Sequence, residues 1–150
     1  ALVAARQASG SYLSYSEQRD GMLYTPEMSR RARVIELWAT LKYLGTQGVD
    51  ELVFGLHQRA MQFADELTDQ GFLVINDVVF NQVLVGFNRD DRYTLDIVEH
   101  IQTSGECWVG TSIWDDAKVI RISVCSWATT EEDVSRSVRA FVAARTAIGN

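Results

Sequence analysis

The sequence predicts an α/β sandwich in which helices cover one face of a mainly antiparallel, four-stranded sheet. Two observations support this prediction. Apolar residues recur every three or four positions in four segments, which is the period of a helix, and four short segments rich in Val, Leu, Ile and Phe have the composition of strands. The last two of these strands are close enough in sequence to form a hairpin.

Two helices are expected in the first half of the chain. The first covers about 27–43, because Pro26 suits the start of a helix and Gly45 can end one. Its apolar residues share one face, namely Val34, Leu37, Trp38, Leu41 and Leu44. Asp50, whose carboxylate can accept hydrogen bonds from free amides, is expected to begin a second helix that continues to Gly71.

Strands and turns are expected after the second helix. The expected strands cover 72–75, 81–87, 107–114 and 118–125. Asn76 and Asp77 provide a turn between the first two, and Asp115-Asp116-Ala117 has the length and composition of a hairpin turn between the last two. A third helix over about 94–103 separates the two pairs of strands, and Gly105 closes it.

The last helix has the clearest sequence signals. Thr129 or Thr130 can cap its start, and the acidic residues of its first turn complement the positive end of the helix dipole. Its buried stripe is expected to consist of Val134, Val138, Phe141 and Val142.

Composition and charge exclude several classes of function. A formal net charge of -6 over 150 residues spreads no positive field along the surface, so nucleic acid is not an expected partner. The apolar runs are far shorter than the ~20 residues that cross a bilayer, so no membrane segment is expected. The first residues carry no recognisable secretory signal, and without an initiator Met the start is expected to be a cut.

Cysteine, histidine and tryptophan give no sign of a metal or aromatic-cage site. Cys107 and Cys125 fit neither a paired-thiol redox motif nor a zinc site, so buried free thiols in a reducing cytoplasm are expected. His57 and His100 share no ligand spacing with carboxylates or thiols. Packing in the core or at an interface is expected for the four tryptophans, Trp38, Trp108, Trp114 and Trp127.

Five phrases together resemble one known family. They are Ser-Tyr-Leu (11–13), Tyr-Thr-Pro-Glu-Met-Ser-Arg-Arg-Ala-Arg (24–33), Asn-Gln-Val-Leu-Val (81–85), Cys-Trp-Val-Gly-Thr (107–111) and Arg-Ile-Ser-Val (121–124). In this order they resemble the pyridoxal-phosphate decarboxylases that act on aromatic amino acids, tyrosine and glutamate, and the likeness covers essentially the whole chain. It implies the small C-terminal domain of a fold-type I enzyme over 48–150, preceded by an interface helix at 26–47 and a catalytic-loop segment at 1–25.

The resemblance implies a cofactor-binding domain upstream, with a His-Lys pair whose lysine holds pyridoxal phosphate. Neither Lys42 nor Lys118 follows a histidine, so neither matches that position. Both are expected to be solvated surface residues. Without the cofactor as electron sink, loss of carbon dioxide is not stabilised, so the fragment alone is expected to be inactive.

Two candidate site residues lie near the start of the chain. Tyr12 matches the tyrosine of the family's mobile loop, which implies a proton donor that serves the active site of the other subunit in a dimer. A phenol is protonated at neutral pH and can act as a general acid in a closed site, although a tyrosine packed on a neighbouring surface is the alternative. Ser29 matches a wall of the substrate pocket, or it is a simple helix cap.

Arg121 is the third candidate. It matches an arginine that, in glutamate decarboxylase and its fold relatives, pairs with the α-carboxylate of the substrate. A guanidinium offers two parallel donors to a carboxylate, and it is costly to bury unpaired among apolar strand residues. The alternative is a strand arginine that reaches solvent or pairs with an acidic side chain.

Two questions about partners stay open at the level of sequence. Arg30, Arg31 and Arg33 form the only basic cluster, for which structural ion pairing, across a dimer for example, is favoured over a place near the cofactor phosphate. The apolar face of the first helix has no obvious partner in this chain, so a homodimer is expected. The competing hypothesis is a stand-alone, non-catalytic module for ligand binding or dimerisation with the same fold.

Overall fold

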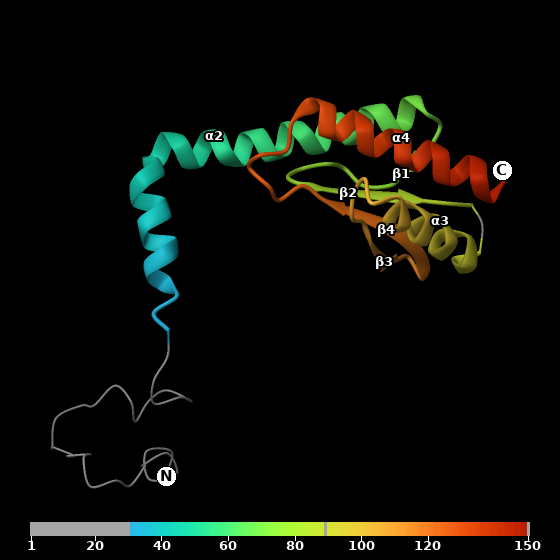
Figure 1. Cartoon of the computed structure of the whole chain (residues 1–150), viewed down its shortest axis with the longest axis horizontal. Helices are drawn as coiled ribbons and strands as arrows, with labels where there is room; N and C mark the ends of the chain where they lie inside the picture. Colours follow the sequence, from blue (N-terminus) through green and yellow to red (C-terminus); the bar gives the residue numbers. More distant parts are fainter. Residues whose placement is uncertain (1–30, 89, 150) are drawn as a thin grey trace, which may run out of the picture. The chain divides into compact units, whose positions relative to one another are not determined.

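The computed structural model describes residues 31–88 and 90–149. Tyr12 and Ser29 therefore lie outside the described residues. The chain divides into two compact units between Tyr43 and Leu44. Figure 1 shows the course of the chain and the labels of its elements.

Helix α2 (Val34–Asp69) is two helical stretches that meet at Gly45, where the backbone is non-helical with φ 65° and ψ -173°. A positive φ costs a glycine little, so the prediction that Gly45 interrupts the helix is confirmed. The predicted start near residue 27 is wrong for the described part, because residues 31–33 are not helical. There a turn forms instead, in which the amide of Ile35 donates to the carbonyl of Ala32 at 3.0 Å.

The second predicted helix also begins earlier than expected. Asp50 is exposed and lies inside the helix, so its role as the first capping residue is wrong. The helix resumes directly after Gly45, and Gly48 has an ordinary helical backbone, packed against Leu44. Gly45, the residue with positive φ, therefore interrupts α2, and the capping preference of Asp50 is not used.

The sheet has four strands in the order β1-β2-β4-β3, and every pairing is antiparallel. The strands are β1 (Leu73–Val74), β2 (Gln82–Gly86), β3 (Gly110–Trp114) and β4 (Ala117–Ser123). All four lie inside the predicted segments or begin one residue before them. β2 and β4 are the inner strands, and β3 forms an edge of the sheet, where its described partner is β4.

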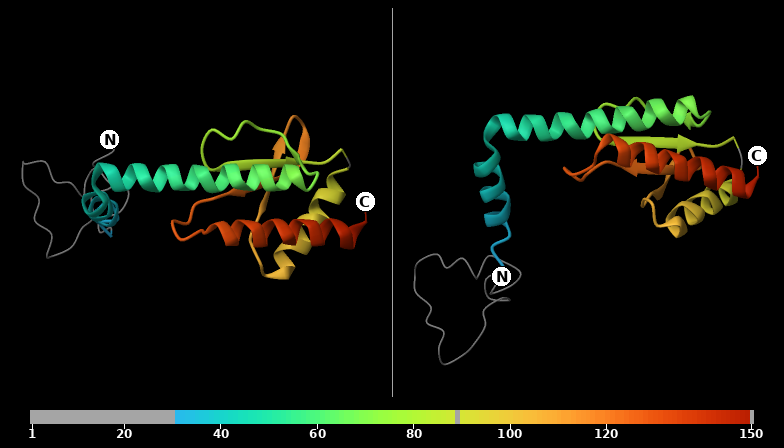
Figure 2. Two further views of the ribbon diagram at one scale, coloured as in Figure 1. Left: turned by 90° about the horizontal axis from the view of Figure 1, so that it is seen from above. Right: turned by 45° about the horizontal axis from the view of Figure 1, so that its top comes forward.

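Three helical segments cover one face of the sheet: residues 44–69 of α2, α3 (Asp91–Ser104) and α4 (Glu131–Ile148). The view from above in Figure 2 shows the last part of α2 along β2, with α4 beside it. The core lies between the two layers and includes Leu67, Val83, Ile97, Ile120 and Phe141, each 0% exposed. The α/β sandwich predicted from the sequence is confirmed.

Local capping chemistry explains the ends of α3 and α4. Asp90 caps α3, since its carboxylate accepts a hydrogen bond from the amide of Tyr93 at 2.9 Å, and Gly105 closes the helix in the left-handed conformation. Of the two predicted caps of α4, Thr130 is the one used. The hairpin between β3 and β4 turns on Asp115 and Asp116, which both have positive φ.

Candidate functional site

Arg121 lies on the face of the sheet that the helices leave open. Its neighbours along β4, Ile120 and Ile122, are buried in the core beneath the helices. Because side chains alternate along a strand, Arg121 points to the opposite face, where it is exposed. Within the described part of the chain, no side chain makes an ion pair or hydrogen bond with its guanidinium.

On the β2 side, Arg121 is flanked by apolar residues and a loop. Leu84 of β2 is its direct cross-strand partner and is 8% exposed. Leu84 also lines a hollow of about 660 Å³ between the strands and the loop that follows β1. The other residues around this hollow are Ile75, Asn76, Asp77, Val79, Phe80, Asn81, Gln82 and Trp114. The open face therefore carries a cation beside a mainly apolar hollow.

The loop over this flank is held by specific hydrogen bonds. The side-chain oxygen of Asn76 accepts a bond from the amide of Leu84 at 2.7 Å, and its side-chain nitrogen donates to the carbonyl of Gln82 at 3.1 Å. His57 of α2 bonds through Nδ1 to the carbonyl of Phe80 at 2.9 Å. These bonds fix the wall of the hollow to both layers of the domain.

The other flank of Arg121 is bare. Gly110 of β3 is its cross-strand partner on that side, so the residue directly opposite Arg121 on the edge strand has no side chain. In the sequence, Gly110 is marked only by its place in the family phrase at 107–111. A glycine inside a strand pattern is the signal that could have marked it, since such glycines often allow a close approach to the backbone.

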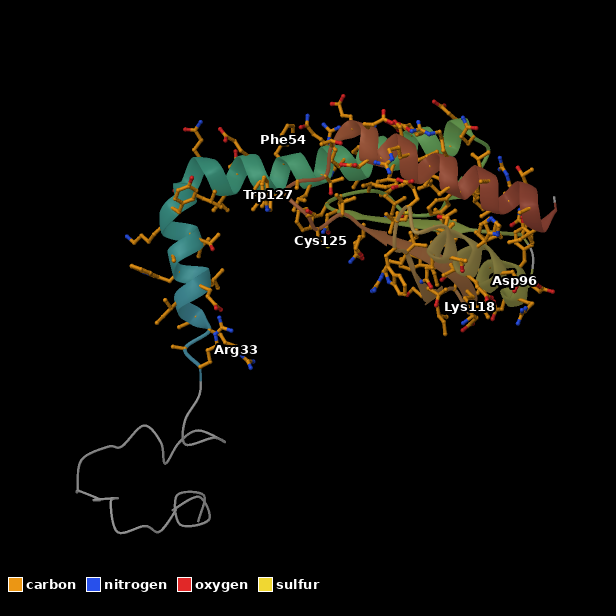
Figure 3. All side chains as sticks on the ribbon, in the orientation of Figure 1. Arg33, Phe54, Asp96, Lys118, Cys125 and Trp127 are labelled. Atoms are coloured by element: carbon orange, nitrogen blue, oxygen red, sulfur yellow. The ribbon has the colours of Figure 1, made fainter. Side chains whose placement is uncertain are left out.

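Lys118 does not share a site with Arg121. Lys118 precedes Arg121 by three residues, so it belongs to the helix-covered face; its amide donates to Asp91 at 2.9 Å. Figure 3 labels Lys118 near α3 and Cys125 at the other end of β4. Lys42 is exposed and belongs to the other unit. The described residues thus fit a carboxylate at Arg121, but they supply no amine beside it that could hold pyridoxal phosphate.

A second hollow, of about 530 Å³, lies at the other end of β4 and does not include Arg121. Cys107 and Cys125 both line it. Burial raises the pKa of the Cys107 thiol, although a hydrogen bond with Ser137 acts in the opposite direction. Both cysteines are free, but Cys125 is exposed, so the prediction that it is buried is wrong. Its position just past β4 leaves it without a covering layer.

The structure also tests the predictions for the arginine cluster, the tryptophans and possible metal ligands. Arg31 pairs with Glu36, in the first turn of α2, which agrees with a structural role for the arginine cluster within the described residues. All four tryptophans are exposed, by 47% at Trp114 to 84% at Trp127, so packing in the core is wrong, and packing at an interface stays a prediction. Among the residues that the structure describes, no group of His, Cys, Asp or Glu is arranged to hold a metal ion.

No helix in the described ranges is long and apolar enough to span a bilayer. Arg121, which has no ion pair within the described residues, and its two unequal flanks are the candidate binding site.

Comparison with known proteins supports the fold. No family model matches the sequence. The chain is similar in structure to Oryza sativa TDC, solved with PLP and tryptamine, with a TM-score of 0.78 and 19% identity over 99% of this chain and 34% of that chain. It is also similar to Catharanthus roseus tryptophan decarboxylase in complex with L-tryptophan, with a TM-score of 0.72 and 17% identity over 83% of this chain and 28% of that chain.

A third similar structure is mouse CSAD, with a TM-score of 0.73 and 16% identity over 95% of this chain and 33% of that chain. The chain therefore shares its α/β fold with part of each of these structures. This chain spans about a third of the length of these solved structures.

Proposed function

We propose that this chain is the C-terminal part of a pyridoxal-phosphate-dependent amino-acid decarboxylase, which converts an amino acid into an amine and carbon dioxide. The observation that carries the proposal is the exposed guanidinium of Arg121, unpaired within the described residues, on the open face of a fold shared with decarboxylase structures. The proposed organisation is a catalytic-loop segment at 1–25, an interface helix at 26–47 and the small domain at 48–150.

Arg121 is proposed to bind the α-carboxylate of the substrate. A guanidinium presents two parallel donors to a carboxylate, and such charge-assisted pairs are shorter and stronger than neutral hydrogen bonds. The position of Arg121 in an inner strand supports this role, because β4 is paired on both sides and fixes the base of the side chain. The interaction between Arg121 and the carboxylate must not be too strong, because the carboxylate is the group that leaves as carbon dioxide.

Pyridoxal phosphate is the proposed cofactor, bound by a part of the longer polypeptide outside this chain. When bound, it supplies the electron sink that stabilises the negative charge left by loss of carbon dioxide. Lys118 does not fit its aldehyde, since it lies on the opposite face of β4 from Arg121, and neither Lys118 nor Lys42 follows a histidine. The fragment alone is therefore proposed to be inactive.

Tyr12 and Ser29 complete the proposed site. Tyr12 is the proposed general acid that returns a proton to the substrate carbon, and Ser29 is a proposed wall of the substrate pocket. Both are assigned by the family phrases in which they stand, because they lie outside the described residues. Tyr12→Phe in the complete enzyme should retain substrate binding and slow amine release by about 10²-fold or more; unchanged turnover would exclude the role.

A homodimer in the cytoplasm is the proposed setting. The segment 34–43 exposes large apolar side chains on more than one side, including Ile35 at 59% and Trp38 at 60%. Apolar surface of this extent on one short helix favours a protein partner. Both cysteines are free, which agrees with a reducing compartment.

The alternative is a stand-alone binding module, and the lack of an amine beside Arg121 within the described residues favours it. One experiment separates the two proposals. The complete polypeptide encoded by the gene should bind pyridoxal phosphate and release carbon dioxide and amine in equal amounts from an L-amino acid. Arg121→Ala should raise the KM for the amino acid about 10²-fold with cofactor affinity retained, and Arg121→Lys should recover part of the loss. A complete polypeptide that binds no cofactor would refute the decarboxylase.

A further inference from the structure

Neither the backbone conformation nor the space around position 110 requires a glycine there. Its φ is not positive, and a Cβ built on it would meet no atom within 4 Å. Two other glycines of the domain differ. A Cβ on Gly86 would come within 3.0 Å of Ile75, and Gly105 has a φ of 73° at the end of α3. A glycine inside a strand weakens it, so packing and conformation alone would favour a larger residue at 110.

The register places Gly110 beside the one cation of the candidate site. Gly110 and Arg121 are cross-strand partners and therefore point to the same, open face. Partners of this kind have Cβ atoms about 4.5–5.5 Å apart, so a side chain at 110 would stand next to that of Arg121. The opposite flank is already filled by Leu84. The edge strand β3 is thus the side from which a ligand can reach the guanidinium.

We propose that Gly110 determines the specificity of this site. Its missing side chain keeps open the flank of Arg121 through which the carboxylate of an amino acid with a side chain on its α-carbon approaches both donors of the guanidinium. The inference depends on the proposed function, since it takes the carboxylate at Arg121 as given. Gly110 contributes empty space beside Arg121 and no contact of its own. A branched residue at 110 would clash with the side chain that the amino acid carries on its α-carbon.

The test uses the complete, cofactor-loaded polypeptide with Gly110→Ala, Gly110→Val and Gly110→Leu. The KM for the amino acid should rise with side-chain size, by about tenfold or more at Val, with kcat and cofactor affinity within about threefold of wild type. Ser112→Val is the matched control, because Ser112 lies on the same strand and face but opposite Val119. It should leave KM unchanged. An unchanged KM in Gly110→Leu would overturn the inference.

A second measurement needs no activity. Phenylglyoxal modifies accessible guanidinium groups, and peptide mass spectrometry gives the rate at each arginine. Gly110→Leu should slow modification of Arg121 by about threefold or more, with exposed Arg33 unaffected. Equal rates at Arg121 in wild type and variant would also contradict the inference.

The two proposals fail in different ways. If Arg121→Ala leaves KM unchanged, the carboxylate role and the proposed function lose their basis. If Arg121→Ala raises KM but Gly110→Val does not, only the role of Gly110 is wrong. The thermal midpoint of Gly110→Val should equal or exceed that of wild type, because valine suits a strand better than glycine; a large drop would mean that the glycine is structural.

Discussion

Thr130 and Asp133 bond to each other in both directions at the start of α4. The carboxylate of Asp133 accepts the amide of Thr130 at 2.9 Å, and the hydroxyl oxygen of Thr130 accepts the amide of Asp133 at 3.2 Å. This capping box satisfies two amides that the helix itself leaves free. It also makes the start of α4 sensitive to the charge of one carboxylate.

Acid should weaken this cap. The hydrogen bond from the Thr130 amide, followed by that from its hydroxyl, lowers the pKa of Asp133 below its ordinary 3.8. A lowered pKa in the folded state means that the stabilisation is complete above the unfolded-state pKa and is lost as the pH falls through the folded-state pKa. Urea unfolding of wild type and Asp133→Asn should therefore differ at pH 6 and converge as the pH falls below about 3.8.

Glu99→Gln, which alters an exposed carboxylate on α3, is the control for the general effect of charge and should not converge in this way. A constant difference between wild type and Asp133→Asn at all pH values would contradict the prediction.

The β3–β4 turn should accept glycine with a gain in stability. Asp115 and Asp116 have φ values of 48° and 61°, a conformation that costs an L-residue energy and glycine very little. Asp116→Gly is expected to raise the free energy of unfolding by about 0.5 kcal/mol, whereas Asp116→Val should lower it by about 1 kcal/mol. Ala117→Gly is the matched control, because Ala117 has an ordinary φ, and it should destabilise. Loss of stability in Asp116→Gly would argue against the turn.

Removal of the central ring of the core should be severely destabilising. Phe141 is 0% exposed, and its ring stands edge-on to that of Phe72 with centroids 5.8 Å apart. Phe141→Ala should cost about 3–5 kcal/mol, measured by urea unfolding. Phe54→Ala, at a position 58% exposed, should cost less than about 1 kcal/mol. Similar losses at both positions would mean that the core is not where the structure places it.

The two thiols should differ in reactivity. Cys125 is exposed, whereas burial raises the pKa of the half-buried Cys107 and so lowers its thiolate fraction near neutral pH. Alkylation by iodoacetamide at pH 7.5, followed by peptide mass spectrometry, should label Cys125 at least about tenfold faster. Ser137→Ala removes a hydrogen bond that lowers the pKa of Cys107, so it should slow labelling there further. Faster labelling of Cys107 would contradict the assignment.

The sequence alone determined those features that depend on contacts within about four residues. The break at Gly45, the closing Gly105, the cap at Thr130 and the turn at Asp115 all follow from side-chain chemistry or a required φ, and each is found where it was expected. The identity of Arg121 as a candidate also came from the sequence, through the family phrase that contains it.

Only the tertiary structure decided which residues surround Arg121 and which helix-start signals are used. Leu84 and Gly110 become its neighbours through strand register, which depends on burial over the whole sheet and not on any local preference. Likewise Asp50 has the chemistry of a cap, but the helix forms around it. Local preferences are worth a fraction of a kcal/mol to about 1 kcal/mol each, so packing overrides them wherever the two conflict.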